Sequence, residues 1–190
     1  MIYKEFDLPD DHPLITSLNE MLNWTKISDA ADRVSGALEI VDDMSEEALN
    51  KRINGETVNK CRMSRFDHNK EFNFDDVQKY SAEVYEEQTG LNDYILYPVA
   101  KTVYPAGGGH LGWHIDSEGG RIYSTYTEGE SFFRYRDPIT KEVITSYDKP
   151  NKWTFRIFTF DENNPLWHCV YAKDQRISIG YRFLHISSLS

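Results

Sequence analysis

Three residues in the second half of the chain have the types and the spacing of a metal site. His114 and Asp116 are two residues apart, so on an extended chain both side chains project from the same face toward one ion. His168 lies in the apolar stretch 165–171, which is typical of a buried strand end. Two imidazoles and one carboxylate on one face of an octahedron leave three positions open. We therefore expect an Fe(II) site, with zinc as the competing interpretation.

A possible anion-binding pair lies eight residues after His168. Arg176 and Ser178 are separated by one residue, so on a strand the guanidinium and the hydroxyl share one face. An arginine can bind a carboxylate through two hydrogen bonds, and a serine can donate a further one. Arg182 is in phase with both residues and is the alternative partner for the same carboxylate. The other interpretation is that Arg176 ends a loop and faces solvent.

Tyr104 is a further candidate because of its place before a glycine-rich segment. It ends an aromatic and β-branched run and leads into residues 105–109, just before the first histidine of the metal set. Glycines permit unusual backbone angles and close approach of the backbone to a ligand. The Tyr104 side chain is expected either to present its phenol to that ligand or to pack in the core.

The elements that must position these residues are predicted from periodicity. Apolar residues three and four apart indicate helices in the first third of the chain, and period-two alternation indicates strands in the rest. The predicted helices are Pro13–Trp24, Ala30–Ile40 after a cap at Ser28, a short helix opened by Ser45, and Phe74–Gln88, which Gly90 ends. The predicted strands are Tyr94–Tyr104, Ile122–Thr127, Ser131–Arg136, Glu142–Tyr147, Trp153–Phe160 and Arg176–Ile186.

This order of elements predicts a single domain over residues 1–190. Residues 1–90 form a mainly helical support region, and residues 91–190 form an antiparallel β-sandwich or barrel that carries the site. The length of 190 residues suits one compact domain, and neither a repeat nor a Pro/Ser-rich linker divides the chain.

Composition limits the setting and the partners. Hydrophobic residues make up 39% and charged residues 27% of the chain, which predicts a soluble protein without a membrane partner. Two cysteines and an acidic amino terminus predict a reducing, cytoplasmic location. A net charge of -10 disfavours nucleic acid as a partner, because phosphate binding depends on Lys and Arg. The oligomeric state is not predicted.

Taken in order, these segments resemble the 2-oxoglutarate/Fe(II) dioxygenase superfamily, and in particular its prolyl hydroxylase-like branch. The resemblance covers about the last hundred residues, from Tyr94 to Ile186. It consists of a strand, glycine loop and H-x-D at 104–116, a glycine-led strand at 129–133, a distal histidine at 167–170 and an R-x-S at 176–178. The implied fold is a double-stranded β-helix, a cupin-like jelly-roll supported by helices.

The resemblance also implies roles for single residues. His114, Asp116 and His168 would bind Fe(II) as the catalytic set. The co-substrates would be dioxygen and 2-oxoglutarate, whose distal carboxylate would be held by Arg176 and Ser178, with Tyr104 at its side and Tyr126 as a further helper. The implied activity is hydroxylation of a peptidyl-prolyl or small-molecule substrate with release of succinate and CO2.

Two other functions stay open at this point. One is a cupin-like protein that binds a metal or a small molecule without oxidative turnover, because the same architecture serves many functions. The other is a nucleobase oxygenase, which needs a basic groove and a base-stacking pocket. The hairpin of residues 132–147, with Arg134 and Arg136 on one face, is either a substrate flap or a solvated hairpin.

Overall fold

The computed structural model describes residues 2–24, 33–35, 44–65, 73–160 and 164–186. The helices are α1 (Pro13–Trp24), α2 (Glu46–Ile53) and α3 (Asp75–Thr89). The strands are β1 (Ile2–Phe6), β2 (Arg33–Ser35), β3 (Cys61–Arg65), β4 (Tyr94–Tyr104), β5 (Gly109–His114), β6 (Gly119–Thr127), β7 (Ser131–Arg136), β8 (Val143–Tyr147), β9 (Trp153–Phe160), β10 (His168–Ala172) and β11 (Arg176–His185).

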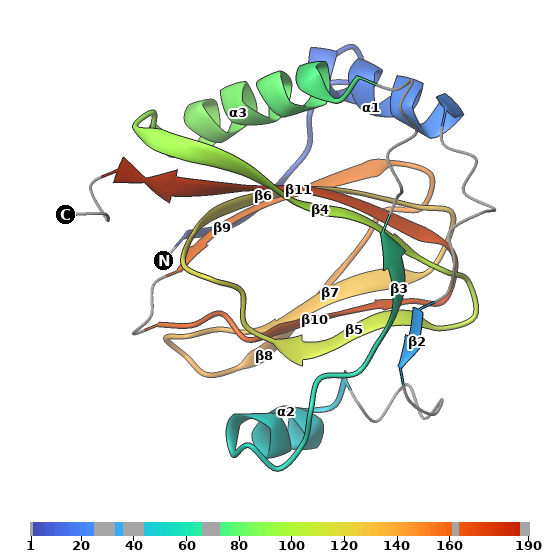
Figure 1. Cartoon of the computed structure of the whole chain (residues 1–190), viewed down its shortest axis with the longest axis vertical. Helices are drawn as coiled ribbons and strands as arrows, with labels where there is room; N and C mark the ends of the chain where they lie inside the picture. The colour runs from blue at the N-terminus through green and yellow to red at the C-terminus, as the bar shows by residue number, and fades with distance from the viewer. Residues whose placement is uncertain (1, 25–32, 36–43, 66–72, 161–163, 187–190) are drawn as a thin grey trace.

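The strands form one antiparallel sheet that curls into two facing layers (Figure 1). Its order is β1-β9-β6-β11-β4-β3-β5-β10-β7-β8, and β2 pairs with β3 outside this path. We call β1, β9, β6, β11 and β4 the major sheet, and β5, β10, β7 and β8 the minor sheet. Strand β3 joins them, because Ser64 pairs with β4 and Cys61 pairs with β5. The interior between the two sheets is where the site residues lie.

The helices cover the outer faces of the sheets (Figure 1). Helices α1 and α3 lie over the major sheet, and α2 lies below β5 of the minor sheet. Leu14, Leu18 and Met21 of α1 are buried at the i, i+4 and i+7 spacing of one helix face. They belong to the same core cluster as Ile177 and Ile179 of β11. Alternation on β11 therefore turns these isoleucines toward the helices and the residues between them toward the interior of the sandwich.

The local signals for three of the predicted helices are confirmed. Helix α1 has the predicted bounds. Ser45 caps α2 by accepting a hydrogen bond from the Ala48 N–H at 3.0 Å. Gly90 ends α3 in the left-handed region, with a φ of 72°.

The helix predicted over Ala30–Ile40 is wrong where the structure can test it. Residues Arg33–Ser35 form strand β2, which pairs with β3, and the rest of that stretch lies outside the described residues. Strands β1 and β3 were not predicted, although both pair with strands of the major sheet. The division at residue 91 between a support region and a core stays a prediction.

The hairpin of residues 132–147 is formed by β7 and β8. Arg134 is held on the outer face, where its Nε donates to Thr145 at 2.8 Å and its Nη1 donates to the Met44 carbonyl at 2.7 Å. Phe133 and Tyr135 belong to the core cluster between the sheets.

Among the described residues, no helix combines the length and the hydropathy of a membrane span.

Candidate metal centre

The structure brings the three predicted metal ligands together at one end of the space between the sheets. His114 is the last residue of β5 and His168 is the first of β10, and the two residues are partners in the strand register. Asp116 follows β5 by two residues. One ligand atom from each side chain lies within 4.8 Å of the other two. The predicted spacing therefore produces a three-sided cluster from two neighbouring strands and the loop that follows one of them.

Backbone carbonyls fix the orientation of both imidazoles. The Nδ1 of His114 lies 2.8 Å from the Gly112 carbonyl, and the Nδ1 of His168 lies 2.9 Å from the Leu166 carbonyl. A carbonyl oxygen can only accept, so Nδ1 carries the proton in the neutral ring and Nε2 keeps its lone pair. A hydrogen bond from the other ring nitrogen to a backbone carbonyl is usual for a metal-binding histidine. Both rings therefore present Nε2 to the space beside Asp116.

The electrostatics of the cluster favour the forms that bind a metal. Burial, followed by the neighbouring His168, lowers the pKa of His114 to about 3, so this imidazole is neutral at neutral pH. Burial by itself would raise the pKa of Asp116, but the two imidazoles hold it below its usual value. A neutral imidazole and a carboxylate are the ligand forms of these side chains, so a cation can bind with little proton release.

Two residues of β6 hold Asp116 from the side of the major sheet. The Tyr123 hydroxyl donates to Asp116 Oδ2 at 3.3 Å, and Arg121 Nε lies 3.8 Å from the same oxygen. Arg121 is only 1% exposed and also donates to the carbonyls of Ser117 and Gly120 at 2.5 and 3.0 Å. It therefore fixes the loop that carries the carboxylate. Neither residue was among the sequence candidates.

A cavity of about 170 Å³ extends from the three ligands into the sandwich. Its lining consists of the ligand cluster, apolar residues of both sheets and a group of polar residues on β4, β6, β9 and β11. These residues are Met63, Val99, Ala100, Thr102, Tyr104, Leu111, His114, Asp116, Tyr123, Thr125, Phe133, Arg156, Phe158, His168, Val170, Arg176 and Ser178. The volume is below the range of about 300–1,000 Å³ that ordinary small-molecule sites occupy, so the cavity suits a short ligand.

Arg176 is the predicted anion-binding residue that the cavity contains. It is 3% exposed, its Nε donates to Asp148 Oδ2 at 2.8 Å and its Nη2 donates to Thr125 Oγ1 at 3.2 Å. Its Nη1 is buried and has no hydrogen-bond partner among the described residues. The ring of Tyr104 lies against the guanidinium, 5.1 Å from its central carbon to the ring centroid. Ser178 lines the same cavity, as alternation on β11 predicts.

Two of the sequence candidates lie elsewhere. Arg182 does not line the cavity; it lies six residues further along β11, and its Nε donates to the Glu118 carbonyl at 2.9 Å. The expectation that Tyr126 helps to bind the co-substrate is corrected, because Tyr126 packs in the helix-facing core cluster and its ring contacts Trp153. Side chains alternate on β6, so the tyrosine that faces the cavity is Tyr123, three residues earlier.

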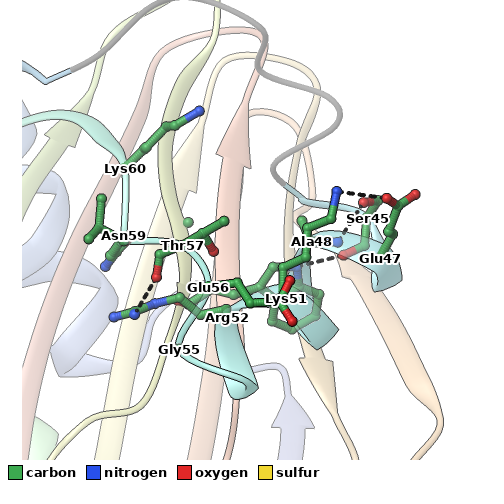
Figure 2. Close-up of a pocket in the computed structure, with 13 residues that line it drawn as sticks. Ser45, Glu47, Ala48, Lys51, Arg52, Gly55, Glu56, Thr57, Asn59 and Lys60 are labelled. Atoms are coloured by element: carbon green, nitrogen blue, oxygen red, sulfur yellow. Dashed lines mark hydrogen bonds and ion pairs between the residues drawn. The ribbon is translucent and has the colours of Figure 1, made fainter.

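A second hollow of the described surface is larger but lacks this chemistry. A groove of about 720 Å³ lies between α2, the segment 55–60 and β5 (Figure 2). Three of its charged groups are engaged locally: Lys51 pairs with Glu47 at 2.7 Å, and Arg52 donates to the Thr57 carbonyl at 2.9 Å. No metal ligand of the cluster lines it. We therefore assign the chemistry to the smaller cavity, where metal-binding groups and a buried cation converge.

Solved structures share this fold at low sequence identity. A Pseudomonas putida prolyl-4-hydroxylase matches with a TM-score of 0.51 and 13% identity, over 96% of this chain and 92% of its own. A Trichoplax adhaerens prolyl hydroxylase, solved with a peptide fragment of the hypoxia inducible factor oxygen degradation domain, matches with a TM-score of 0.51 and 16% identity, over 99% and 86%. The predicted fold class, mainly β with a double-stranded β-helix, is confirmed. No family model and no curated protein matches the sequence.

Proposed function

We propose that this chain is an Fe(II)- and 2-oxoglutarate-dependent oxygenase that hydroxylates its substrate. One observation carries the proposal: a buried arginine with an unpartnered Nη1 among the described residues lines the same cavity as three converging metal ligands. Arg176 is paired with Asp148, but a buried guanidinium N–H without an acceptor still costs free energy, so a protein that bound only a metal would gain nothing from it. A carboxylate that reaches Arg176 offsets that cost. The cupin-like binding protein without a co-substrate is therefore the weaker interpretation.

The residues fit the metal that the proposal requires. His114 and His168 offer Nε2 and Asp116 offers a carboxylate, which is the donor set of non-haem Fe(II) oxygenases. The side chain of Asp116 is 26% exposed, so this end of the cavity opens to solvent and to an approaching substrate. When bound, Fe(II) supplies the redox chemistry that activates dioxygen and cleaves the oxo acid.

The overall reaction converts 2-oxoglutarate, dioxygen and a substrate C–H group into succinate, CO2 and a C–OH group. One oxygen atom of dioxygen enters succinate and the other enters the hydroxyl, so atoms balance. The chain contributes positioning and exclusion of water. Arg176 and Ser178 hold the distal carboxylate of 2-oxoglutarate, and Tyr104 packs beside it. Phe133 and Phe158 line the same cavity, and their ring centroids lie 5.3 and 5.8 Å from that of His168.

The substrate class stays a prediction. A peptidyl-proline or a small molecule remains the expected substrate, and the small cavity supports binding of the substrate outside it, at the open end. Two solved structures with this fold are prolyl hydroxylases, which is compatible with the first of these substrates. A cytoplasmic location and a single domain over residues 1–190 are also proposed, from the composition and the length of the chain.

Calorimetric titration of 2-oxoglutarate tests the proposal without the unknown substrate. The protein is loaded with Mn(II), a redox-stable substitute for Fe(II), and compared with metal-free protein. We expect binding that requires the metal. Arg176→Ala should weaken it by about 100-fold, because charge-assisted hydrogen bonds to a buried carboxylate contribute about 1.5–3 kcal/mol.

Arg182→Ala is the matched control, because it removes an arginine in phase on the same strand but outside the cavity. Its affinity for 2-oxoglutarate should stay within about threefold of that of the unmodified protein, because Arg182 does not line the cavity and donates to a backbone carbonyl instead. If Arg182→Ala weakens 2-oxoglutarate binding and Arg176→Ala does not, the distal carboxylate binds to Arg182 and the assignment of Arg176 is wrong. Absence of metal-dependent 2-oxoglutarate binding would overturn the proposed function.

A further inference from the structure

A buried charge cluster closes the end of the cavity away from the metal ligands. We use this name for Arg156, Asp148 and Arg176, whose side chains are at most 3% exposed. Asp148 lies between the two arginines: Arg156 Nη1 donates to its Oδ1 at 2.5 Å and Arg176 Nε donates to its Oδ2 at 2.8 Å. Ser131 donates a third hydrogen bond to the same carboxylate. Both arginines line the cavity, although they come from different strands.

The two arginines differ in what they have left to offer. Arg156 also donates from Nε and Nη2 to Ser146 Oγ, at 3.1 and 2.7 Å, and its Nε lies 3.2 Å from Glu5 Oε2 of β1. All three of its nitrogens are therefore engaged. Arg176 keeps Nη1 without a partner among the described residues. A ligand carboxylate can thus bind to Arg176, whereas Arg156 cannot turn toward a ligand without breaking several bonds.

The charges of the cluster do not cancel. The three groups that are at most 3% exposed, two arginines and one aspartate, carry a net charge of +1, and Glu5, which is 32% exposed, pairs with Arg156 at 3.2 Å from the edge of the cluster and offsets part of this charge. Without Arg156, the carboxylate of Asp148 would neutralise Arg176 alone. A ligand carboxylate would then enter a buried site with no uncompensated positive charge, which is unfavourable in a low-dielectric interior.

We propose that Arg156 is a positioning residue for co-substrate binding: it takes up the charge of Asp148, so that Arg176 stays available to the distal carboxylate of 2-oxoglutarate. This inference rests on the proposed function and deepens it. It assigns to Arg156 an effect on the ligand that it exerts through Asp148 and not by contact. Asp148 in turn holds Arg176 by its Nε, so that the guanidinium meets the ligand through its terminal nitrogens.

A double-mutant cycle distinguishes this role from a structural one. Arg156→Met leaves Asp148 and Arg176 as a neutral pair and should weaken 2-oxoglutarate binding to the Mn(II)-loaded protein by about tenfold or more. Adding Asp148→Asn removes the carboxylate as well, so Arg176 regains its uncompensated charge while the amide oxygen of the substituted side chain can still accept from its Nε. The double variant should bind within about threefold of the unmodified protein.

Two controls make the result specific. Pyruvate has the same 2-oxo acid end as 2-oxoglutarate but lacks the distal carboxylate, so Arg156→Met should leave its affinity unchanged. Arg156→Lys keeps the charge and should bind 2-oxoglutarate within about threefold of the unmodified protein, because the effect is electrostatic. This variant and the double variant carry the test if Arg156→Met does not fold, which thermal unfolding reports.

The outcomes separate the two proposals. If the unmodified protein binds 2-oxoglutarate and Arg156→Met binds it equally well, the role of Arg156 is refuted while the proposed function stands. The same holds if the double variant is no better than Arg156→Met, or if Arg156→Lys loses as much affinity as Arg156→Met. If the unmodified protein itself fails to bind 2-oxoglutarate with metal present, the proposed function fails first.

Discussion

The two ends of the cavity are held by different kinds of interaction. At the metal end, each imidazole is oriented by one backbone carbonyl, and Asp116 is 26% exposed. At the arginine end, Asp148 is fully buried and accepts hydrogen bonds from two arginines and a serine. Under the proposed function, a cation would complete the metal end, where three donor atoms converge. The arginine end is assembled from buried charged side chains of the chain itself.

This difference separates binding from stability. Substitution of one metal-ligand side chain should leave distant elements of the fold undisturbed. Its effect should therefore appear mainly as lost metal affinity. The arginine end ties Asp148, which follows β8, to β9 and β11 through buried charges, and the part-exposed Glu5 of β1 pairs with Arg156; removing Asp148 leaves an uncompensated charge in the core. Substitutions at the two ends should therefore differ in which measurement they change.

The largest effect is expected at the metal end. His168→Ala removes one of three ligands, and Mn(II) affinity measured by calorimetry should fall by at least about 100-fold, since each ligand contributes several kcal/mol to a protein metal site. His12→Ala is the control, because His12 precedes α1 and does not line the cavity. Unchanged Mn(II) affinity in His168→Ala would remove this histidine from the ligand set.

At the arginine end the main effect should be on stability. Asp148→Ala leaves two buried arginines without their shared partner, and the free energy of unfolding in urea should fall by about 3–5 kcal/mol. Asp137→Ala serves as a control, because Asp137 lies in the exposed turn between β7 and β8, where its side chain accepts backbone hydrogen bonds from Ile139 and Thr140. Equal, small losses in both variants would show that the cluster does not stabilise the fold.

The pH dependence of stability should also mark the arginine end. Burial by itself would raise the pKa of Asp148, but Arg176 and Arg156 lower it to about 2, below the value of about 3.9 for an unfolded chain. The contribution is therefore present above about pH 4 and is lost as the pH falls through about 2. It amounts to about 2–3 kcal/mol. Urea unfolding should show that the difference in free energy of unfolding between the unmodified protein and Asp148→Asn becomes smaller as the pH falls from about 4 to about 2. A difference that stays constant over this range would contradict the lowered pKa of Asp148.

The smallest effect concerns the hydrogen bond that supports the metal end. Tyr123→Phe removes the hydroxyl that donates to Asp116 Oδ2, and Mn(II) affinity should fall by up to about tenfold, the lower end for partners of metal ligands. Tyr126→Phe is a matched control on the same strand, because its side chain packs on the helix side. A larger loss in Tyr126→Phe than in Tyr123→Phe would reverse the assigned faces of β6.

Residues that are close together in the sequence could be predicted as parts of the site, whereas contacts between distant segments could not. His114 and Asp116 are a local pair at a strand end, and Arg176 and Ser178 share a face by alternation, so their spacing could predict that they line one cavity, while their roles in binding stay predictions. Tyr126 was chosen in the wrong phase, although the alternation of β6 could have selected Tyr123 instead.

Other features left no local signal in the sequence. Asp148 follows β8 and meets Arg176 of β11, 28 residues later in the chain, only in the folded structure. Strand β3 reads Cys-Arg-Met-Ser-Arg, which lacks the β-branched and aromatic residues that predict a strand. It is formed because β4 and β5 both offer it backbone partners.

A crystal structure of the protein with Mn(II) and 2-oxoglutarate tests the central claim most directly. We expect the metal between His114, Asp116 and His168, with the 2-oxo acid end of the ligand on the metal. The distal carboxylate should accept hydrogen bonds from Arg176 Nη1 inside the same cavity. A 2-oxoglutarate molecule bound at Arg182 or in the groove beside α2, or a metal held by other residues, would contradict the account.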